Sequence, residues 1–137
     1  MSDCCFVRVC VREKDAAKFQ KIFWPDTPVN HDRVPPNDGE EKLFIELEYE
    51  EVNYGGVNEL EEAARAGLFF FGIHHRGDDY EGEKFCSWRC ALHMHTIDID
   101  GVLTLAADDE DDLRDSKRRW KRFLHVYEQA VRRVRGS

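Results

Sequence analysis

The chain has 137 residues, of which 42% are hydrophobic, 12% aromatic and 35% charged, and its formal net charge is −8. This length and composition fit one globular domain spanning residues 1–137 and exclude a disordered or collagen-like chain. No apolar run approaches the roughly 18 residues that a membrane-spanning helix needs, and no secretory leader is visible, so a soluble, cytoplasmic protein is expected. Five cysteines in such a chain are expected to be reduced thiols rather than a disulfide framework.

The charge is divided unevenly along the chain. Residues 1–115 contain 27 acidic and 12 basic residues, a balance of −15, whereas residues 116–137 contain one acidic and eight basic residues, a balance of +7. A strongly acidic body repels nucleic acids and membrane surfaces and attracts basic protein surfaces. We therefore expect a basic protein partner, no membrane contact and no direct binding of nucleic acid. The basic C-terminal segment is expected to pair with acidic neighbours within the protein.

The first third of the chain predicts a strand, a helix and a loop. In Cys5–Arg12 valines occupy every second position, which is the pattern of a strand with one buried face. Asp15–Trp24 changes to apolar residues at helical spacing, so a helix is predicted to pack back on this strand. Pro25–Glu41 holds all four prolines of the chain and is predicted to be a surface loop.

The next two elements carry many of the acidic residues. Lys42–Val52 alternates apolar side chains with glutamates, so one face of this strand is predicted to join the core and the other to carry carboxylates about every 6.6 Å. Val57–Ala66 is predicted to be a short helix that turns its glutamates outward and ends at Gly67. The predicted partner-binding residues on these two elements are Glu46, Glu48, Glu50, Glu51, Glu59, Glu61 and Glu62. Such a charged surface also discourages aggregation, so solubility is the alternative role.

The second half of the chain begins with Leu68–His75, which is apolar on both faces and predicts the central strand of a sheet. Phe85–Ile97 is predicted to be one strand that turns at Asp98–Gly101 into a second strand at Val102–Ala106. A long helix follows from Asp108–Asp112 onward, because acidic residues suit its N-terminus and arginines its C-terminus. The stripe predicted to pack on the sheet is Leu113, Trp120, Phe123, Leu124, Tyr127, Val131 and Val134. These elements predict an α+β sandwich with a sheet of about five strands, helices mainly on one face and a long C-terminal helix.

A metal site is the first chemical hypothesis. The zinc-binding residue types in the predicted strand Phe85–Ile97 are Cys86, Cys90, His93 and His95. On one continuous strand the two cysteines point to one face and the two histidines to the other, so the four do not converge. A three-histidine site built from His74, His93 and His95 is the alternative. With such a site the protein would be a small metal-dependent enzyme that uses the face formed by these three histidines and His75.

Catalysis is not expected from the remaining residues. The sequence contains no serine-hydrolase, phosphate-loop, dinucleotide-binding or zinc-protease motif. The cysteines are expected to be small buried apolar residues rather than nucleophiles, because a nucleophilic thiol needs a nearby base and an electropositive setting. We therefore predict a non-catalytic protein with no cofactor and no resident metal.

The run Gly67–His75, followed by Gly77–Tyr80 after a short acidic helix, resembles a pattern in small acidic proteins of phages and other mobile elements. The resemblance covers Tyr49–Tyr80. Some proteins of this kind are anti-CRISPR or antirestriction inhibitors, so the resemblance implies a nucleic-acid mimic that occupies the basic surface of a host nuclease complex. An immunity protein that neutralises a basic toxin is the alternative. The resemblance transfers no site residues, and the basic C-terminal helix departs from a purely acidic mimic.

Overall fold

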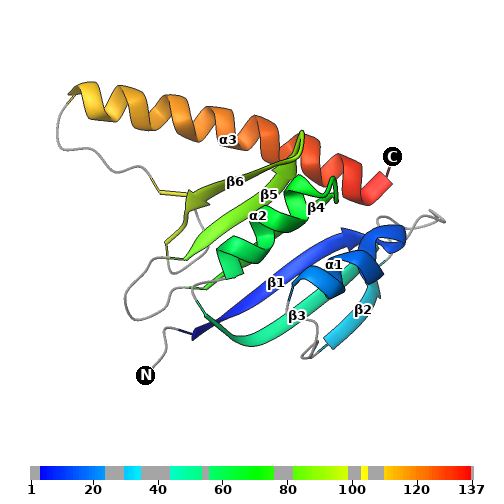
Figure 1. Cartoon of the computed structure of the whole chain (residues 1–137). Coiled ribbons are helices and arrows are strands. Elements are labelled where there is room, and N and C mark those ends of the chain that lie inside the picture. The colour runs from blue at the N-terminus through cyan, green and yellow to red at the C-terminus, as the bar shows by residue number, and fades with distance from the viewer. Residues whose placement is uncertain are drawn as a thin grey trace.

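One antiparallel sheet runs through the protein, with helices on both of its faces (Figure 1). This computed structural model describes residues 4–23, 30–34, 44–53, 56–75, 82–98, 103–104 and 110–136. The elements in chain order are β1 (Cys4–Arg12), α1 (Ala16–Ile22), β2 (Asn30–Val34), β3 (Phe44–Asn53), α2 (Val57–Arg65), β4 (Phe70–His74), β5 (Glu83–Trp88), β6 (Ala91–Thr96) and α3 (Glu110–Gly136). The six strands are ordered β2-β3-β1-β4-β5-β6 across the sheet. The predicted α+β architecture with a long C-terminal helix is confirmed.

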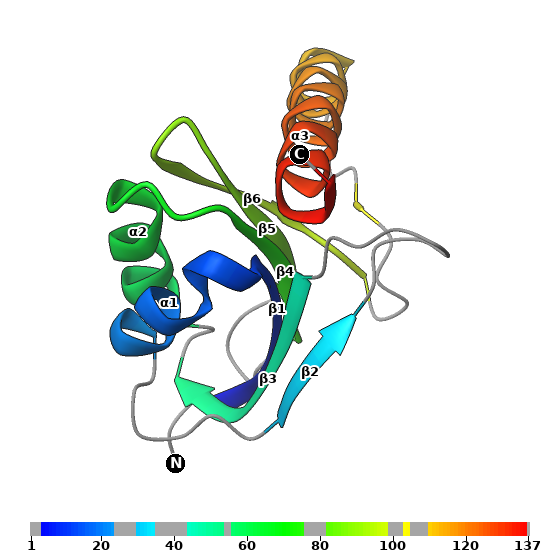
Figure 2. The same ribbon diagram turned by 90° about the vertical axis from the view of Figure 1, so that its right-hand side faces the viewer.

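The main core lies between the sheet and the helices α1 and α2, which share one side of the sheet (Figure 2). The alternate valines of β1 and the alternate apolar residues of β3, Ile45 and Leu47, point into this core. They meet Phe19 of α1, Phe23 directly after α1 and Leu60 of α2, and all of these side chains are at most 2% exposed. The alternation predicted for these two strands is therefore confirmed, because their apolar positions form one buried face.

Helix α3 packs on the opposite face, over β4, β5 and β6 and against β1 (Figure 2). Its Val134 contacts the buried Cys10 of β1, and Phe69 and Phe71 pack around this pair. The Tyr127 ring lies edge-on to the Phe71 ring, with the ring centroids 5.8 Å apart. Strands β3 and β2 extend away from α3, so none of the described helices covers them on this face.

Strand β4 is the central strand that the sequence predicts, with β1 on one side and β5 on the other. Phe70, Gly72 and His74 are buried on the face of α1 and α2. Gly72 is required at its position, because a Cβ there would overlap the carbonyl oxygen of Arg8 in β1. The close approach of β1 and β4 therefore depends on this glycine.

Two predicted segments differ from the structure. β2 lies inside Pro25–Glu41, which was predicted to be a loop, so the described sheet has an edge strand that the sequence pattern does not predict. The predicted single strand Phe85–Ile97 is a hairpin of β5 and β6, which turns at Arg89 and Cys90 with φ angles of 52° and 61°. Glycine or asparagine ordinarily marks such a left-handed turn, and neither is present here.

The predicted strand Val102–Ala106 is represented by one antiparallel bridge, between Ile97 and Leu103. The Thr104 amide donates a hydrogen bond to the Thr96 carbonyl oxygen at 3.0 Å, which extends this contact by one residue. Residues 105–109 lie outside the described residues. Leu103 and Thr104 therefore lie along the outer edge of the sheet at the end of β6.

The apolar stripe predicted for the last helix is only partly buried. Phe123 is buried, but Leu113 and Leu124 are 38% and 39% exposed. Val134 of the predicted stripe is also buried, and the small residues Ser116 and Ala130, which were not part of the stripe, are buried beside it. Neither α3 nor any other helix in the described ranges has a stretch long and apolar enough to cross a membrane.

Candidate functional site

The outward face of β3 carries Glu46 and Glu48 on either side of one cation. The Arg8 side chain reaches across from β1, and its Nε lies 3.3 Å from Oε1 of each glutamate. The glutamate side chains are 27% and 20% exposed, and the Arg8 side chain is 48% exposed. One guanidinium thus contacts both carboxylates. The sequence pattern does not reveal Arg8 as part of this group, because the register of two strands cannot be read from either strand alone.

The neighbouring strand β2 adds one acidic position beside Glu46. Asp32 of β2 pairs with Glu46 in the antiparallel ladder. The register between β1 and β3 shifts between Cys5 and Val7, so Glu50 and Glu51 together lie opposite a single β1 residue. The ladder is therefore regular from Phe44 to Tyr49 and irregular at Glu50 and Glu51. The side chains of Glu50 and Glu51 lie outside the described part of the chain.

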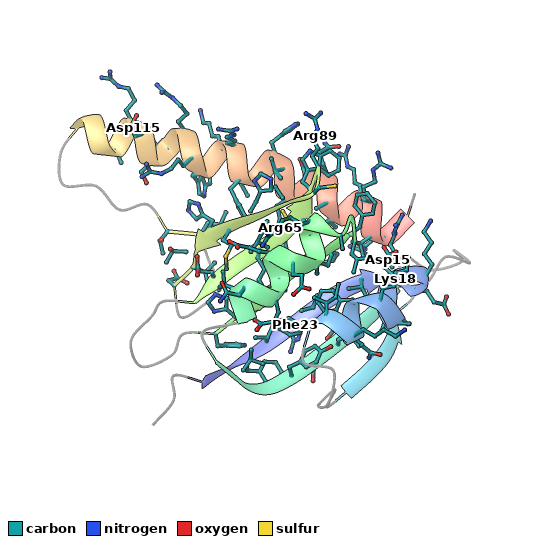
Figure 3. The ribbon with its side chains drawn as sticks, viewed as in Figure 1. Asp15, Lys18, Phe23, Arg65, Arg89 and Asp115 are labelled. Atoms are coloured by element: carbon teal, nitrogen blue, oxygen red, sulfur yellow. The ribbon has the colours of Figure 1, made fainter. Side chains whose placement is uncertain are left out.

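The glutamates of α2 lie on the other side of the sheet. This helix turns Leu60 into the core, while Glu61 and Glu62 are exposed and Glu59 is half-buried. Glu61 lies 3.9 Å from the guanidinium of Arg65, which Figure 3 labels on α2. The α2 glutamates face solvent on the helix side, whereas the β3 glutamates face solvent on the side of α3. One flat partner surface therefore cannot contact both predicted sets.

His74 is a buried histidine of β4, with 1% of its area exposed. Its Nε2 lies 3.1 Å from Oε1 of Glu83, and its Nδ1 lies 3.1 Å from the carbonyl oxygen of His75. Both partners are acceptors, so only the imidazolium form, with an N–H at each nitrogen, donates both hydrogen bonds. The Nε2 contact thus joins His74 to Glu83 on the neighbouring strand, and it is an ion pair when the imidazole is protonated.

The alternative three-histidine metal site is not assembled. His74 points to the face of α1 and α2, whereas His93 and His95 point to the face of α3, because alternate residues of a strand point to opposite faces. The His95 ring lies 5.5 Å from the Phe123 ring of α3. His75 is exposed and packs edge-on against Phe6, 5.5 Å away. Within the described ranges, no group of three or more His, Cys, Asp or Glu side chains is placed to hold a metal ion.

The β5–β6 hairpin changes the neighbours of Cys86. This cysteine pairs directly with His93 across the hairpin, on the same face, rather than pointing away from it as on a single strand. Burial raises the pKa of Cys86, and that of Cys10, to about 12. Both thiols are therefore protonated at neutral pH and are poor nucleophiles and poor metal ligands. Cys90, at the turn, is a free and exposed thiol.

An open groove of about 520 Å³ lies between β6 and the N-terminal half of α3. His93 and His95 line it from the strand, and Arg119, Arg122 and Phe123 line it from the helix. The sequence pattern does not predict this site, because the groove depends on the unpredicted hairpin of β5 and β6. It brings two histidines and two arginines together.

Helix α3 also carries basic side chains beyond the groove. Its exposed cations in the N-terminal half are Arg114, Lys117, Arg118, Arg119, Lys121 and Arg122. Figure 3 shows side chains projecting outward from the part of α3 that includes Asp115. Arg118 lies 3.9 Å from Asp115, and among the described residues it is the one cation of this set with an acidic neighbour in contact. The acidic side chains of residues 108–112, which precede this set, lie outside the described part of the chain, so the expected internal pairing stays a prediction here.

Comparison of the chain with models of protein families, with curated proteins and with solved structures finds no significant match. The two surfaces, the acidic face of β3 and the groove beside β6, are therefore the basis for inferring function.

Proposed function

We propose that the protein is a non-catalytic binding protein that engages a basic surface of a protein partner through the acidic face of β3. The supporting observation is the contact of one guanidinium, that of Arg8, with both Glu46 and Glu48. Two carboxylates on one strand face are spaced to hold a guanidinium between them. Both glutamates are partly exposed, so an arginine or lysine of a partner that reaches their solvent side makes a further ion pair with them.

A nuclease or other nucleic-acid-binding complex is the partner class that we favour. Proteins that bind nucleic acid do so through lysines and arginines that contact phosphates, and carboxylates along a strand carry the same sign of charge as those phosphates. Attraction of this kind accelerates association and weakens as salt is added. This is the anti-CRISPR-like or antirestriction-like inhibition that the sequence resemblance implies, and we propose that it takes place in the cytoplasm.

The proposed interface is limited to one side of the sheet. The face of β3 lies beyond the part of the sheet that α3 covers, and Asp32 of β2 occupies the position next to Glu46. The exposed glutamates of α2 point to the opposite side and belong to a surface that also carries Arg65. We therefore assign the partner contact to Glu46 and Glu48 and assign solubility to Glu61 and Glu62.

The proposed function is tested by capturing a partner and comparing how two variants, each with two fewer negative charges, bind it. The tagged protein is incubated with the basic fraction of host lysate that phosphocellulose retains, and bound proteins are identified at increasing salt. E46Q/E48Q and E61Q/E62Q lose the same two charges from opposite sides of the sheet. We expect the first variant to bind the captured partner at least about tenfold more weakly and the second to bind nearly as wild type. If both variants weaken binding of the partner equally, binding depends on the net charge of the protein rather than on the acidic face of β3, and the proposal is contradicted.

A further inference from the structure

The groove between β6 and α3 has one positively charged wall. Arg119 and Arg122 line it from α3, where they lie one helical turn apart on the same side, and both are exposed. Neither side chain makes an ion pair or a hydrogen bond with another residue in the described ranges. Two guanidinium groups with free donors therefore border the same cavity.

The opposite wall adds histidine side chains. The Nε2–H of His95 donates to the carbonyl oxygen of Thr104, with 2.9 Å between the two atoms, and this contact fixes the ring against Phe123. His93 lies two residues before His95 on β6 and also lines the groove. Its side chain is half-buried and has no hydrogen-bond partner among the described residues. The acidic residue of the lining is Glu83, whose Oε1 already accepts from His74 at 3.1 Å. The groove thus offers more donors than acceptors.

We propose that this groove binds a small phosphate-bearing ligand of about mononucleotide size. Guanidinium groups match the geometry of phosphate oxygens, because each presents two parallel N–H donors. The volume of about 520 Å³ lies within the roughly 300–1,000 Å³ of small-molecule sites. The ring pair of His95 and Phe123, with centroids 5.5 Å apart, gives the groove an aromatic wall against which a flat base can pack.

A small ligand fits this site better than a nucleic acid chain does. Electrostatic interactions in water are screened over about 10 Å at 0.1 M salt, so a single phosphate in the groove responds mainly to Arg119 and Arg122. A long polyanion would extend beyond the groove along a body in which residues 1–115 carry a balance of −15, from 27 acidic and 12 basic residues. Repulsion from that body grows with each phosphate outside the groove.

Titration of the isotope-labelled full chain with four probes tests the proposal, with calorimetry for affinity and NMR amide shifts for location. The probes are ATP, pyrophosphate, adenosine and a short single-stranded oligodeoxynucleotide. We expect ATP and pyrophosphate to bind saturably and to shift the amides of β6 and of α3 around Arg119. Adenosine, which lacks phosphate, is expected to bind at least about tenfold more weakly than ATP.

Two double variants with substitutions in α3 show where on the protein ATP binds. R119Q/R122Q removes both groove arginines, whereas R114Q/K121Q removes the same charge from exposed positions outside the groove lining. We expect the first to weaken ATP binding at least about tenfold and the second less than about threefold. Equal weakening by both variants, adenosine binding as tight as ATP binding, or no saturable binding of ATP or pyrophosphate overturns the proposal. Binding of the oligonucleotide without ATP overturns it in favour of a polynucleotide surface.

Discussion

The Tyr49 ring packs edge-on against the Phe23 ring, with centroids 4.8 Å apart, and its hydroxyl is buried without a hydrogen-bond partner among the described residues. Burial also raises the pKa of Tyr49, because the charged phenolate is disfavoured there. A buried polar group without a partner costs about 1–3 kcal/mol. The hydroxyl therefore opposes the packing of its own ring.

Replacing this tyrosine by phenylalanine keeps the ring contact and removes the buried hydroxyl. We expect Tyr49→Phe to raise the free energy of unfolding by about 1 kcal/mol, measured by urea denaturation. Phe23→Ala serves as the comparison, since it removes the ring contact and should lower stability by about 3–5 kcal/mol. A loss of stability in Tyr49→Phe would show that the hydroxyl has a partner.

Gly72 should tolerate no side chain. A Cβ at this position would overlap the Arg8 carbonyl oxygen of the neighbouring strand and would lie 2.9 Å from the Phe85 ring. We expect Gly72→Ala to lower the free energy of unfolding by more than about 3 kcal/mol, because the strand pair must separate. Gly67 is the matched control, with a φ of 84° but open space around it, so Gly67→Ala should cost only about 1 kcal/mol in the same assay. Equal costs for the two variants would contradict the close approach of β1 and β4.

The three cysteines whose side chains are described should differ sharply in reactivity. Cys90 is exposed at the β5–β6 turn, whereas Cys10 and Cys86 are buried and their pKa values are raised to about 12. Iodoacetamide should label Cys90 at least about a hundredfold faster than either buried thiol in the folded protein, with mass spectrometry resolving the sites. Labelling of Cys86 at the rate of Cys90 would show that the hairpin opens readily or is wrongly placed.

The same two buried thiols should make stability fall at alkaline pH. Their pKa values are raised from 9.0 to about 12 by burial, so above pH 9 the unfolded chain releases protons that the folded chain retains. The stabilising contribution is complete below pH 9 and is lost as the pH rises toward 12, at about 1.4 kcal/mol per pH unit for each thiol. Urea denaturation across this range should show a shallower decline in a variant that carries Cys10→Ala and Cys86→Ala. An identical decline in that variant would assign the effect to other groups.

Much of the fold could be predicted from local pattern. The alternation in β1 and β3, the end of α2 at Gly67 and the central place of β4 each follow from residues close in sequence. β2 could not be predicted because prolines surround it, and the β5–β6 turn could not because Arg89 and Cys90 adopt left-handed angles without glycine. The burial of Ser116 and Ala130 on α3 could not be predicted because neither residue is strongly apolar.

The candidate sites were less predictable because they depend on which strands become neighbours. The sequence places Glu46 and Glu48 on one strand face, but the Arg8 contact with them follows from the pairing of β1 with β3. Likewise the separation of the α2 glutamates from the β3 glutamates follows from the side of the sheet on which α2 packs. The pairing of strands that are distant in the sequence cannot be predicted from the hydrophobic periodicity of a single strand or helix.

The contact of Arg8 with Glu46 and Glu48 also gives the most direct test of the proposed function, because changes at the two ends of this contact should act in opposite directions. The measurement is the dissociation constant of the captured partner for wild type, Arg8→Gln and E46Q/E48Q, at low and high salt. Arg8→Gln removes a competing cation from the face and should tighten binding by about threefold, whereas E46Q/E48Q should weaken it by at least about tenfold. Both effects should shrink at high salt. Weaker binding by Arg8→Gln, together with unchanged binding by E46Q/E48Q, would contradict an acidic interface on β3.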